Sequence, residues 1–266
     1  MKKRVISAII ALIIAVPIFI KGGMLFNLFI YVLSMLGLKE FLNTKATKKE
    51  LPSFIDFISY IVMTLIVVSN FERIDIVFSL DYRIIVGLFL IFLLPTIIYH
   101  DRKKYSVVDA FHLIGGIFFL GVSFSLMILL RNIDLKILIY LFIITIITDT
   151  YAYLTGRLIG QHKLLEDISP NKTWEGTIGG TVFGVLISTV YYMTVFNSKT
   201  SLIIVILMSL FLSILGQYGD LVFSAIKRYY GKKDFSNIMP GHGGILDRFD
   251  SIIFVILGFM FFITLI

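Results

Sequence analysis

The sequence of 266 residues contains no cysteine, only five prolines and few charged residues, which make up 15% of the chain. Without cysteine there is no disulfide bond, no thiolate nucleophile and no cysteine-ligated zinc. Apolar residues make up 58% of the chain, and apolar runs of about 20 residues, the length that crosses a bilayer, recur along it. These runs are continuous rather than alternating, which favours helices over a membrane barrel. The sequence predicts an all-α polytopic integral membrane protein.

We predict about nine transmembrane helices. They lie at roughly residues 5–20, 24–42, 53–70, 82–99, 107–130, 134–158, 175–196, 201–226 and 250–266. The first run follows Lys2, Lys3 and Arg4, as in a signal peptide, but lacks a small-x-small cleavage site, so we interpret it as a retained helix. Pro17 and Pro95 lie inside apolar runs, which membrane helices tolerate when neighbours satisfy the freed backbone groups.

The distribution of Lys and Arg predicts the orientation of these helices. With a cytoplasmic N-terminus, 18 of the 24 Lys and Arg residues fall in cytoplasmic segments and 6 in outside loops. Positive loops stay inside, so we predict that the N-terminus is cytoplasmic and the C-terminus outside. The net charge of +7 then reflects topology, and we expect no nucleic-acid partner. We interpret residues 1–130 as scaffold helices and residues 131–266 as the region that carries the chemistry.

The densest cluster of charge lies between Ser224 and Asp250. Its cations are Lys227, Arg228, Lys232, Lys233 and Arg248, and its acids are Asp234, Asp247 and Asp250, with Asp220 just upstream. Carboxylates three residues apart on a helix share a face, so Asp247 and Asp250 could hold Mg²⁺ together. The cluster indicates a metal–phosphate site; the alternative is a cytoplasmic loop that is merely charged.

Within this cluster a glycine-rich turn surrounds His242. Gly241, Gly243 and Gly244 lack side chains, so their backbone N–H groups can face an anion. The turn is therefore a candidate phosphate cradle.

Asp149 and Asp220 lie well inside predicted membrane helices of the C-terminal region. A carboxylate there needs a wet cavity, a cation or a metal. Asp149 therefore indicates a functional site, or else an ion pair with a basic residue on a neighbouring helix. Asp220, Ser224 and Lys227 are spaced about one turn apart, which places an acid at depth and cations at the interface on one helix face.

The loop before the seventh predicted span contains Ser169, Lys172 and Thr173. Free N–H groups at a helix start bind phosphate. Plain capping by Thr173 is the alternative. In that span Gly176, Gly180 and Gly184 recur every four residues, which predicts close helix packing.

These motifs resemble the signature of bacterial phosphatidate cytidylyltransferases, also called CDP-diacylglycerol synthases. The signature positions are Ser224, Lys227, Arg228, Lys233, Asp234, Pro240, His242, Gly243, Gly244, Asp247, Arg248 and Asp250. Upstream matches include Asp149, Ala152, Tyr153, Gly156, Arg157, His162, Lys163, Ser169, Pro170, Lys172, Thr173, Glu175, Gly176, Gly219 and Asp220. The resemblance covers roughly residues 145–255 and departs at Phe223, where many relatives carry Glu, and at Met239, where Leu, Ile or Phe is usual.

The resemblance implies a Mg²⁺-dependent nucleotidyltransferase of phospholipid biosynthesis. Such an enzyme transfers CMP from CTP to phosphatidate and releases CDP-diacylglycerol and pyrophosphate, with K⁺ as an expected second cation. The expected partners are CTP, phosphatidate within the bilayer, membrane lipid and a second copy of the chain. The expected location is the bacterial cytoplasmic (inner) membrane, as a multi-pass protein whose active site faces the cytoplasm.

The resemblance also assigns roles to residues. Metal ligands would be Asp220 and Asp247, with Asp250 or Asp149 as a further ligand or a supporting group. The catalytic set would be Asp220, Asp247, Lys227, Arg228 and His242, with His242 as a hydrogen-bond donor. The residues expected to bind substrate are Ser169, Lys172, Thr173, Ser224, Lys233, Gly241, Gly243, Gly244 and Arg248.

Three other interpretations remain open. A cation-coupled transporter would also place acids in membrane helices, although no inverted repeat is evident. An inactive or altered-substrate relative is the second, because Phe223 removes a carboxylate near the signature. An isoprenoid-type lipid could replace phosphatidate, because acyl chains are recognised only by apolar surfaces. The Asp-Gly-x-x-Ala-Arg pattern of CDP-alcohol phosphotransferases is not found.

Overall fold

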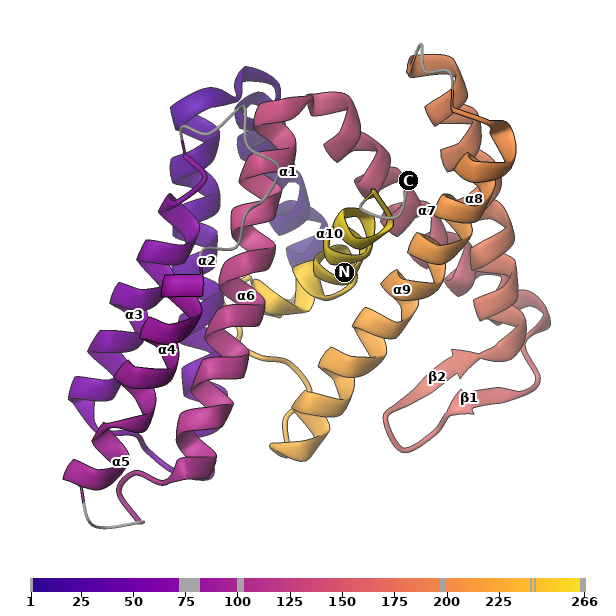
Figure 1. The fold of residues 1–266 in the computed structure, drawn as a ribbon. Helices are drawn as coiled ribbons and strands as arrows, with labels where there is room; N and C mark the ends of the chain where they lie inside the picture. Colours follow the sequence, from indigo (N-terminus) through magenta and orange to yellow (C-terminus); the bar gives the residue numbers. More distant parts are fainter. Residues whose placement is uncertain are drawn as a thin grey trace. The chain divides into compact units, whose positions relative to one another are not determined.

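The structure, a computed structural model, describes residues 2–71, 82–99, 103–196, 200–239, 241 and 243–263. Within these residues the chain forms helices and one two-stranded hairpin (Figure 1). The helices are α1 (Lys2–Lys21), α2 (Gly23–Ala46), α3 (Ser53–Val68), α4 (Tyr82–Leu93), α5 (Pro95–Ile98), α6 (Val107–Ile133), α7 (Leu135–Ile159), α8 (Trp174–Val195), α9 (Leu202–Tyr229) and α10 (Leu246–Ile263). The strands are β1 (Lys163–Leu165) and β2 (Ser169–Thr173).

The protein is an all-α membrane protein apart from this hairpin. Five helices are long and apolar enough to cross a bilayer: α2, α6, α7, α8 and α9. Each predicted span coincides with a helix to within a few residues, the fourth with α4 and α5 together. The number of crossings and their orientation remain predictions. The hairpin is a difference from the sequence analysis, which predicted only a loop there.

The helix break between α4 and α5 has a local cause. Pro95 has no backbone N–H, so it cannot donate the hydrogen bond that would continue α4. The chain makes a turn at Leu94 and resumes as the four-residue helix α5. The predicted span at 82–99 is therefore present as two helices, α4 and α5, rather than as one continuous helix.

The described chain forms two compact units (Figure 1). The first unit comprises residues 1–133 and 234–245, and the second comprises residues 134–233 and 246–266.

In the first unit, α2, α3 and α6 pack against one another. A polar clamp joins the C-terminal end of α2 to the start of α6. Lys45 Nζ lies 2.6 Å from Asp109 Oδ1, and Lys49 contacts the other oxygen of the same carboxylate. The Asp109 carboxylate also accepts a hydrogen bond of 2.9 Å from the backbone N–H of Ser106, which stabilises the first turn of α6.

In the second unit, α7 and α8 pack through glycines. A methyl group on Gly180 would lie 2.5 Å from the Thr148 carbonyl oxygen, and one on Gly176 would lie 2.6 Å from the Ala152 carbonyl oxygen. A methyl group on Gly184 would collide with the Thr148 hydroxyl. The predicted close packing along these glycines is confirmed, because real side chains do not approach backbone so closely.

Buried hydroxyls complete the second unit's apolar interior. Tyr140 pairs with Ser209 at 2.8 Å, and Thr148 pairs with Ser213 at 2.9 Å. These pairs join α7 to α9 at membrane depth, where an unpaired hydroxyl would be costly.

Candidate active site

Asp220, the acid in the C-terminal half of α9, contacts both a hydroxyl and a cation. Asp220 Oδ1 accepts a hydrogen bond of 3.2 Å from Ser224 Oγ, one helical turn further on. Asp220 Oδ2 lies 2.6 Å from Lys172 Nζ, which comes from strand β2. The predicted common face of Asp220 and Ser224 is thus present, and the hairpin supplies its cation. Both side chains of the ion pair are partly open, at 26% exposure for Lys172 and 30% for Asp220.

A second, buried ion pair joins α9 to α10. Lys227 Nζ lies 2.7 Å from Asp247 Oδ1, with side-chain exposures of 10% and 3%. Asp247 belongs to the first turn of α10. A buried carboxylate of this kind depends on its cation, because removing one partner leaves an uncompensated charge.

Asp149 and Asp250 join the same region from α7 and α10. Asp149 lies beside Ser251, and the Ser251 N–H donates to Asp250 Oδ1 at 2.8 Å. Asp149, Asp220 and Asp250 lie within electrostatic range of one another. Arg248 is exposed and acts electrostatically on Asp149. Four elements, α7, β2, α9 and α10, therefore contribute charge to one place.

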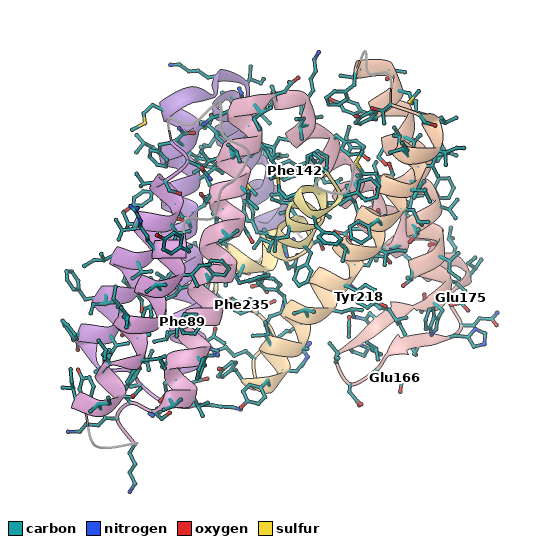
Figure 2. The ribbon with its side chains drawn as sticks, in the orientation of Figure 1. Phe89, Phe142, Glu166, Glu175, Tyr218 and Phe235 are labelled. Carbon is teal, nitrogen blue, oxygen red and sulfur yellow. The ribbon has the colours of Figure 1, made fainter. Side chains whose placement is uncertain are left out.

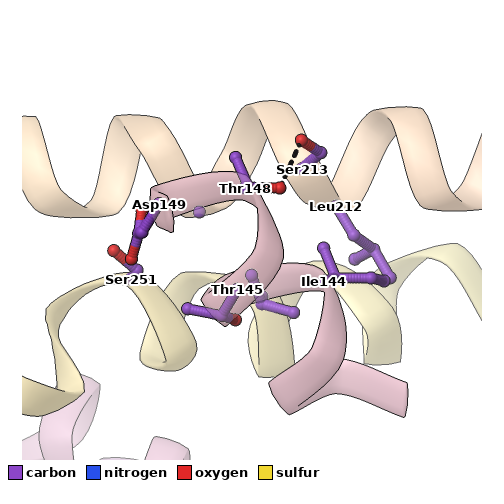
Figure 3. A pocket seen from close by; sticks show the side chains of 9 residues that line it. Ile144, Thr145, Thr148, Asp149, Leu212, Ser213 and Ser251 are labelled. Carbon is purple, nitrogen blue, oxygen red and sulfur yellow. Dashed lines mark hydrogen bonds between the residues drawn. The ribbon is translucent and has the colours of Figure 1, made fainter. Parts of the chain in front are cut away.

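Asp149 and Ser251 also line a narrow pocket between α7, α9 and α10 (Figure 3). The rest of the lining is part apolar, from Ile144, Leu212 and Val255, and part hydroxyl, including the hydrogen-bonded pair of Thr148 and Ser213. The space is too small to admit a water molecule. Beyond Asp149 and Ser251 the helices are thus packed rather than open.

The hairpin between α7 and α8 is fixed at its base. Thr173 is the N-cap of α8, and its hydroxyl accepts a hydrogen bond of 3.1 Å from Gly176 N–H, so the capping interpretation is confirmed. Glu175 accepts from the N–H groups of Gln161 and His162 at 3.2 Å each, and its carboxylate lies 2.6 Å from His162 Nδ1. These contacts hold the strand that carries Lys172.

Figure 2 shows Glu175 near the base of the hairpin and Glu166 in the connection between its strands. Ser169, the first residue of β2, pairs in register with Leu165 and is partly exposed. It lies in the same strand as Lys172, three residues earlier.

Two of the predicted cations lie at the end of α9. Arg228 is exposed and donates to the Lys232 carbonyl oxygen at 3.0 Å. Gly231 has a φ of 68°, a left-handed conformation that ends the helix, and Lys232 N–H donates to the Lys227 carbonyl oxygen at 2.8 Å. Lys233 is exposed beyond this cap.

The glycine-rich turn belongs to the first unit. Gly241 and Gly243 have φ values of 79° and 83°, and Met239 N–H donates to the Gly243 carbonyl oxygen at 3.0 Å. Gly243 and Gly244 are buried, whereas Gly241 is exposed. His242 and Pro240 lie outside the described residues.

The departure at Phe223 has a packing explanation. Phe223 is 2% exposed, and its ring meets that of Phe254 in an edge-to-face contact at 6.4 Å between centroids. It therefore packs α9 against α10, a role that an acid would not fill.

The residues can be tested for a fit to Mg²⁺. Within the described part of the chain, no group of three or more His, Asp and Glu side chains has a metal-site arrangement. The donor chemistry nevertheless suits a hard cation, because Asp149, Asp220 and Asp250 offer only carboxylate oxygens and lie in electrostatic range of one another.

Two polar residues were missed by the sequence analysis. Ser251 follows the signature directly and lines the same pocket as Asp149. Glu40 is an acid within an apolar helix of the first unit, the same signal that singled out Asp149. A search for acids within apolar runs would have identified Glu40, but it would not have identified the residues that Glu40 contacts.

The fold and this cluster define a class: a helical membrane protein with cation–carboxylate pairs gathered in one unit. The model of the cytidylyltransferase family matches residues 2–266, and the chain belongs to that family. The phosphatidate cytidylyltransferases of Staphylococcus haemolyticus and Staphylococcus saprophyticus are each 38% identical to it, over 257 and 258 residues. That of Staphylococcus aureus is 37% identical over 258 residues. Each of these alignments covers 96% of both chains.

Proposed function

We propose that this protein is a phosphatidate cytidylyltransferase, which transfers CMP from CTP to phosphatidate and releases pyrophosphate. Relatives of that name align over 96% of the chain. The observation that carries the proposal at the site is the gathering of Lys172, Asp220, Lys227 and Asp247 in one unit. Cations suit phosphates, and carboxylates suit the metal that accompanies a nucleoside triphosphate.

The reaction needs no nucleophile from the protein. A phosphate oxygen of phosphatidate attacks the α-phosphorus of CTP, and a new P–O–P bond forms. The bond from the α-phosphorus to the oxygen bridging it to the β-phosphorus breaks, and that oxygen leaves with pyrophosphate. Catalysis then consists of positioning and charge neutralisation, which a chain without cysteine can supply.

The side chains have distinct proposed tasks. Lys172 is partly exposed and Arg248 is exposed, and both bind phosphate oxygens of the substrates. Lys227 holds the Asp247 carboxylate in one orientation. Asp220 and Asp247 would hold Mg²⁺, with Asp149 or Asp250 as a further ligand, and the ion would neutralise charge on the triphosphate. K⁺ is proposed as a second cation, and Arg228 as a further phosphate contact.

The cellular setting is also part of the proposal. The excess of Lys and Arg in alternate loops supports nine spans, a cytoplasmic N-terminus and an active site facing the cytoplasm of a bacterial inner membrane. CTP then arrives from the cytoplasm and phosphatidate from within the bilayer. A homodimer and surrounding lipid are the proposed partners.

The test is a transfer assay with the purified, detergent-solubilised protein. Phosphatidate, Mg²⁺, K⁺ and labelled CTP are supplied, and label is followed into the lipid phase. We expect label that depends on phosphatidate and disappears with EDTA. Asp220→Asn and Asp247→Asn should lower turnover by about 100-fold or more in folded protein. Glu166→Gln, an exposed acid of the hairpin, should retain full activity.

Other outcomes separate the alternatives. Full activity in either Asp variant contradicts its metal assignment. If CTP binds and CMP is transferred to an isoprenoid phosphate but not to phosphatidate, the lipid substrate is an isoprenoid phosphate. If the protein takes cations up into proteoliposomes without CTP and does not bind CTP, the protein is a transporter and not this enzyme.

A further inference from the structure

Glu40 occupies an unusual position for an acid. It lies in the interior of α2 and is 1% exposed. Burial of a carboxylate is unfavourable unless hydrogen bonds replace its hydration. Glu40 must therefore be held by donors, and its neighbours show which ones.

The donors come from the far end of the first unit's sequence. The Ile245 backbone N–H donates to Glu40 Oε1 at 2.8 Å, and Ser236 Oγ donates to the same oxygen at 2.6 Å. These residues are 205 and 196 positions away in the chain. Together they tie both ends of the segment 236–245 to α2.

The backbone of the turn is shaped for this carboxylate. Gly243 adopts the left-handed region, with φ at 83°, and two residues later the Ile245 N–H donates to Glu40. A methyl group on Gly244 would collide with Glu40 Oε1 and lie 2.6 Å from its Oε2. The glycine at 244 thus leaves room for the Glu40 carboxylate, and this end of the predicted phosphate cradle holds a carboxylate of the protein itself.

We propose that Glu40 is a positioning residue for the reaction: by holding the Gly243–Ile245 turn, it fixes the point at which the chain enters α10. Leu246, the first residue of α10, follows Ile245 directly, and Asp247 comes next. The role rests on the proposed function, since it acts through Asp247. It gives the N-terminal half a part in the chemistry beyond scaffolding.

The experiment compares Glu40→Ala, Glu40→Gln and the matched control Glu50→Gln, an exposed acid just beyond α2. We expect Glu40→Ala to lower kcat about tenfold or more and to raise the Mg²⁺ concentration for half-maximal rate, with the KM for CTP changed less than about threefold. Glu40→Gln keeps an acceptor oxygen and should retain an intermediate kcat. The control should match the unaltered protein.

Hydrogen exchange gives a readout that does not need activity. In Glu40→Ala the amides of residues 243–245 should exchange at least about tenfold faster, while those of α9 stay unchanged. If Glu40→Ala does not insert, Glu40→Gln and Gly244→Ala carry the test, and Gly244→Ala should reproduce the loss of kcat because its methyl group displaces the carboxylate.

Several results would overturn the proposal. A lower Tm with unchanged kcat and Mg²⁺ dependence would make Glu40 structural only. A raised KM with unchanged kcat would place it against CTP. Unchanged exchange at residues 243–245 would remove the anchor itself, and this holds even if the unaltered protein proves inactive, a result that would reject the proposed function separately.

Discussion

The two lysine–aspartate pairs of the second unit differ most in their exposure. Lys227 and Asp247 are nearly sealed from solvent, with exposures of 10% and 3%, whereas Lys172 and Asp220 are open at 26% and 30%. A sealed pair stabilises the fold only while both partners are present. An open pair contributes little to stability and leaves its groups able to exchange partners for a substrate or an ion.

This contrast yields a prediction for matched substitutions. Lys227→Met should lower the free energy of unfolding by about 3 kcal/mol, because it leaves the Asp247 carboxylate buried without its cation. Lys172→Met should change that free energy by less than about 1 kcal/mol. Denaturation in detergent, followed by tryptophan fluorescence, measures both.

For Lys172 the effect should appear in activity rather than in stability. Lys172→Met should raise the KM for CTP or phosphatidate in well-folded protein, because it removes a phosphate contact. An equal loss of stability in both variants would contradict the difference in burial.

At the scale of elements, the hairpin and the α7–α8 pair together place the site. Glycines let α8 approach α7 until backbone meets backbone, and Thr173 and Glu175 fix the hairpin at the start of α8. Lys172 reaches Asp220 from that hairpin. Packing between these helices therefore controls where a substrate-binding cation lies.

We predict that Gly180→Val abolishes folded protein or reduces its yield severely. Its side chain would have to occupy the place of the Thr148 carbonyl oxygen, which lies 2.5 Å from the position of a methyl group. Ile178→Val, at an exposed position of the same helix, is the control and should behave normally. Yield of monodisperse protein after solubilisation is the measurement; a normal yield for Gly180→Val would show that the helices can separate without loss of the fold.

At the scale of the whole molecule, the absence of cysteine makes orientation directly testable. A single introduced cysteine is the only thiol, so labelling reports one position. Lys48→Cys lies in a predicted cytoplasmic segment, and Lys136→Cys at the predicted outside end of the sixth span, in the first turn of α7.

In cells whose cell wall or outer membrane has been removed but whose inner membrane is intact, a membrane-impermeant maleimide should label Lys136→Cys without permeabilisation. It should label Lys48→Cys only after the membrane is permeabilised. The reverse pattern would show that the orientation is the opposite of the predicted one. Labelling of both cysteines from one side would show an even number of membrane crossings between them, instead of the predicted three.

The sequence by itself determined the helices and the types of residue at the site. In lipid only helices and closed barrels satisfy the backbone, and continuous apolar runs select helices. Local spacing also predicted the glycine face of α8 and the cap at Thr173. It did not predict the hairpin, whose strands are too short to show a period.

Tertiary structure alone decided which charges meet. Lys172 with Asp220, Lys227 with Asp247, and Glu40 with Ile245 join residues from different elements, the last pair 205 positions apart. Local periodicity does not identify such partners, because it shows only which residues share one face of a helix and not which other element packs against that face. Glu40 had the same sequence signal as Asp149, and only packing showed that Glu40 holds a backbone turn whereas Asp149 lies near other acids of the site.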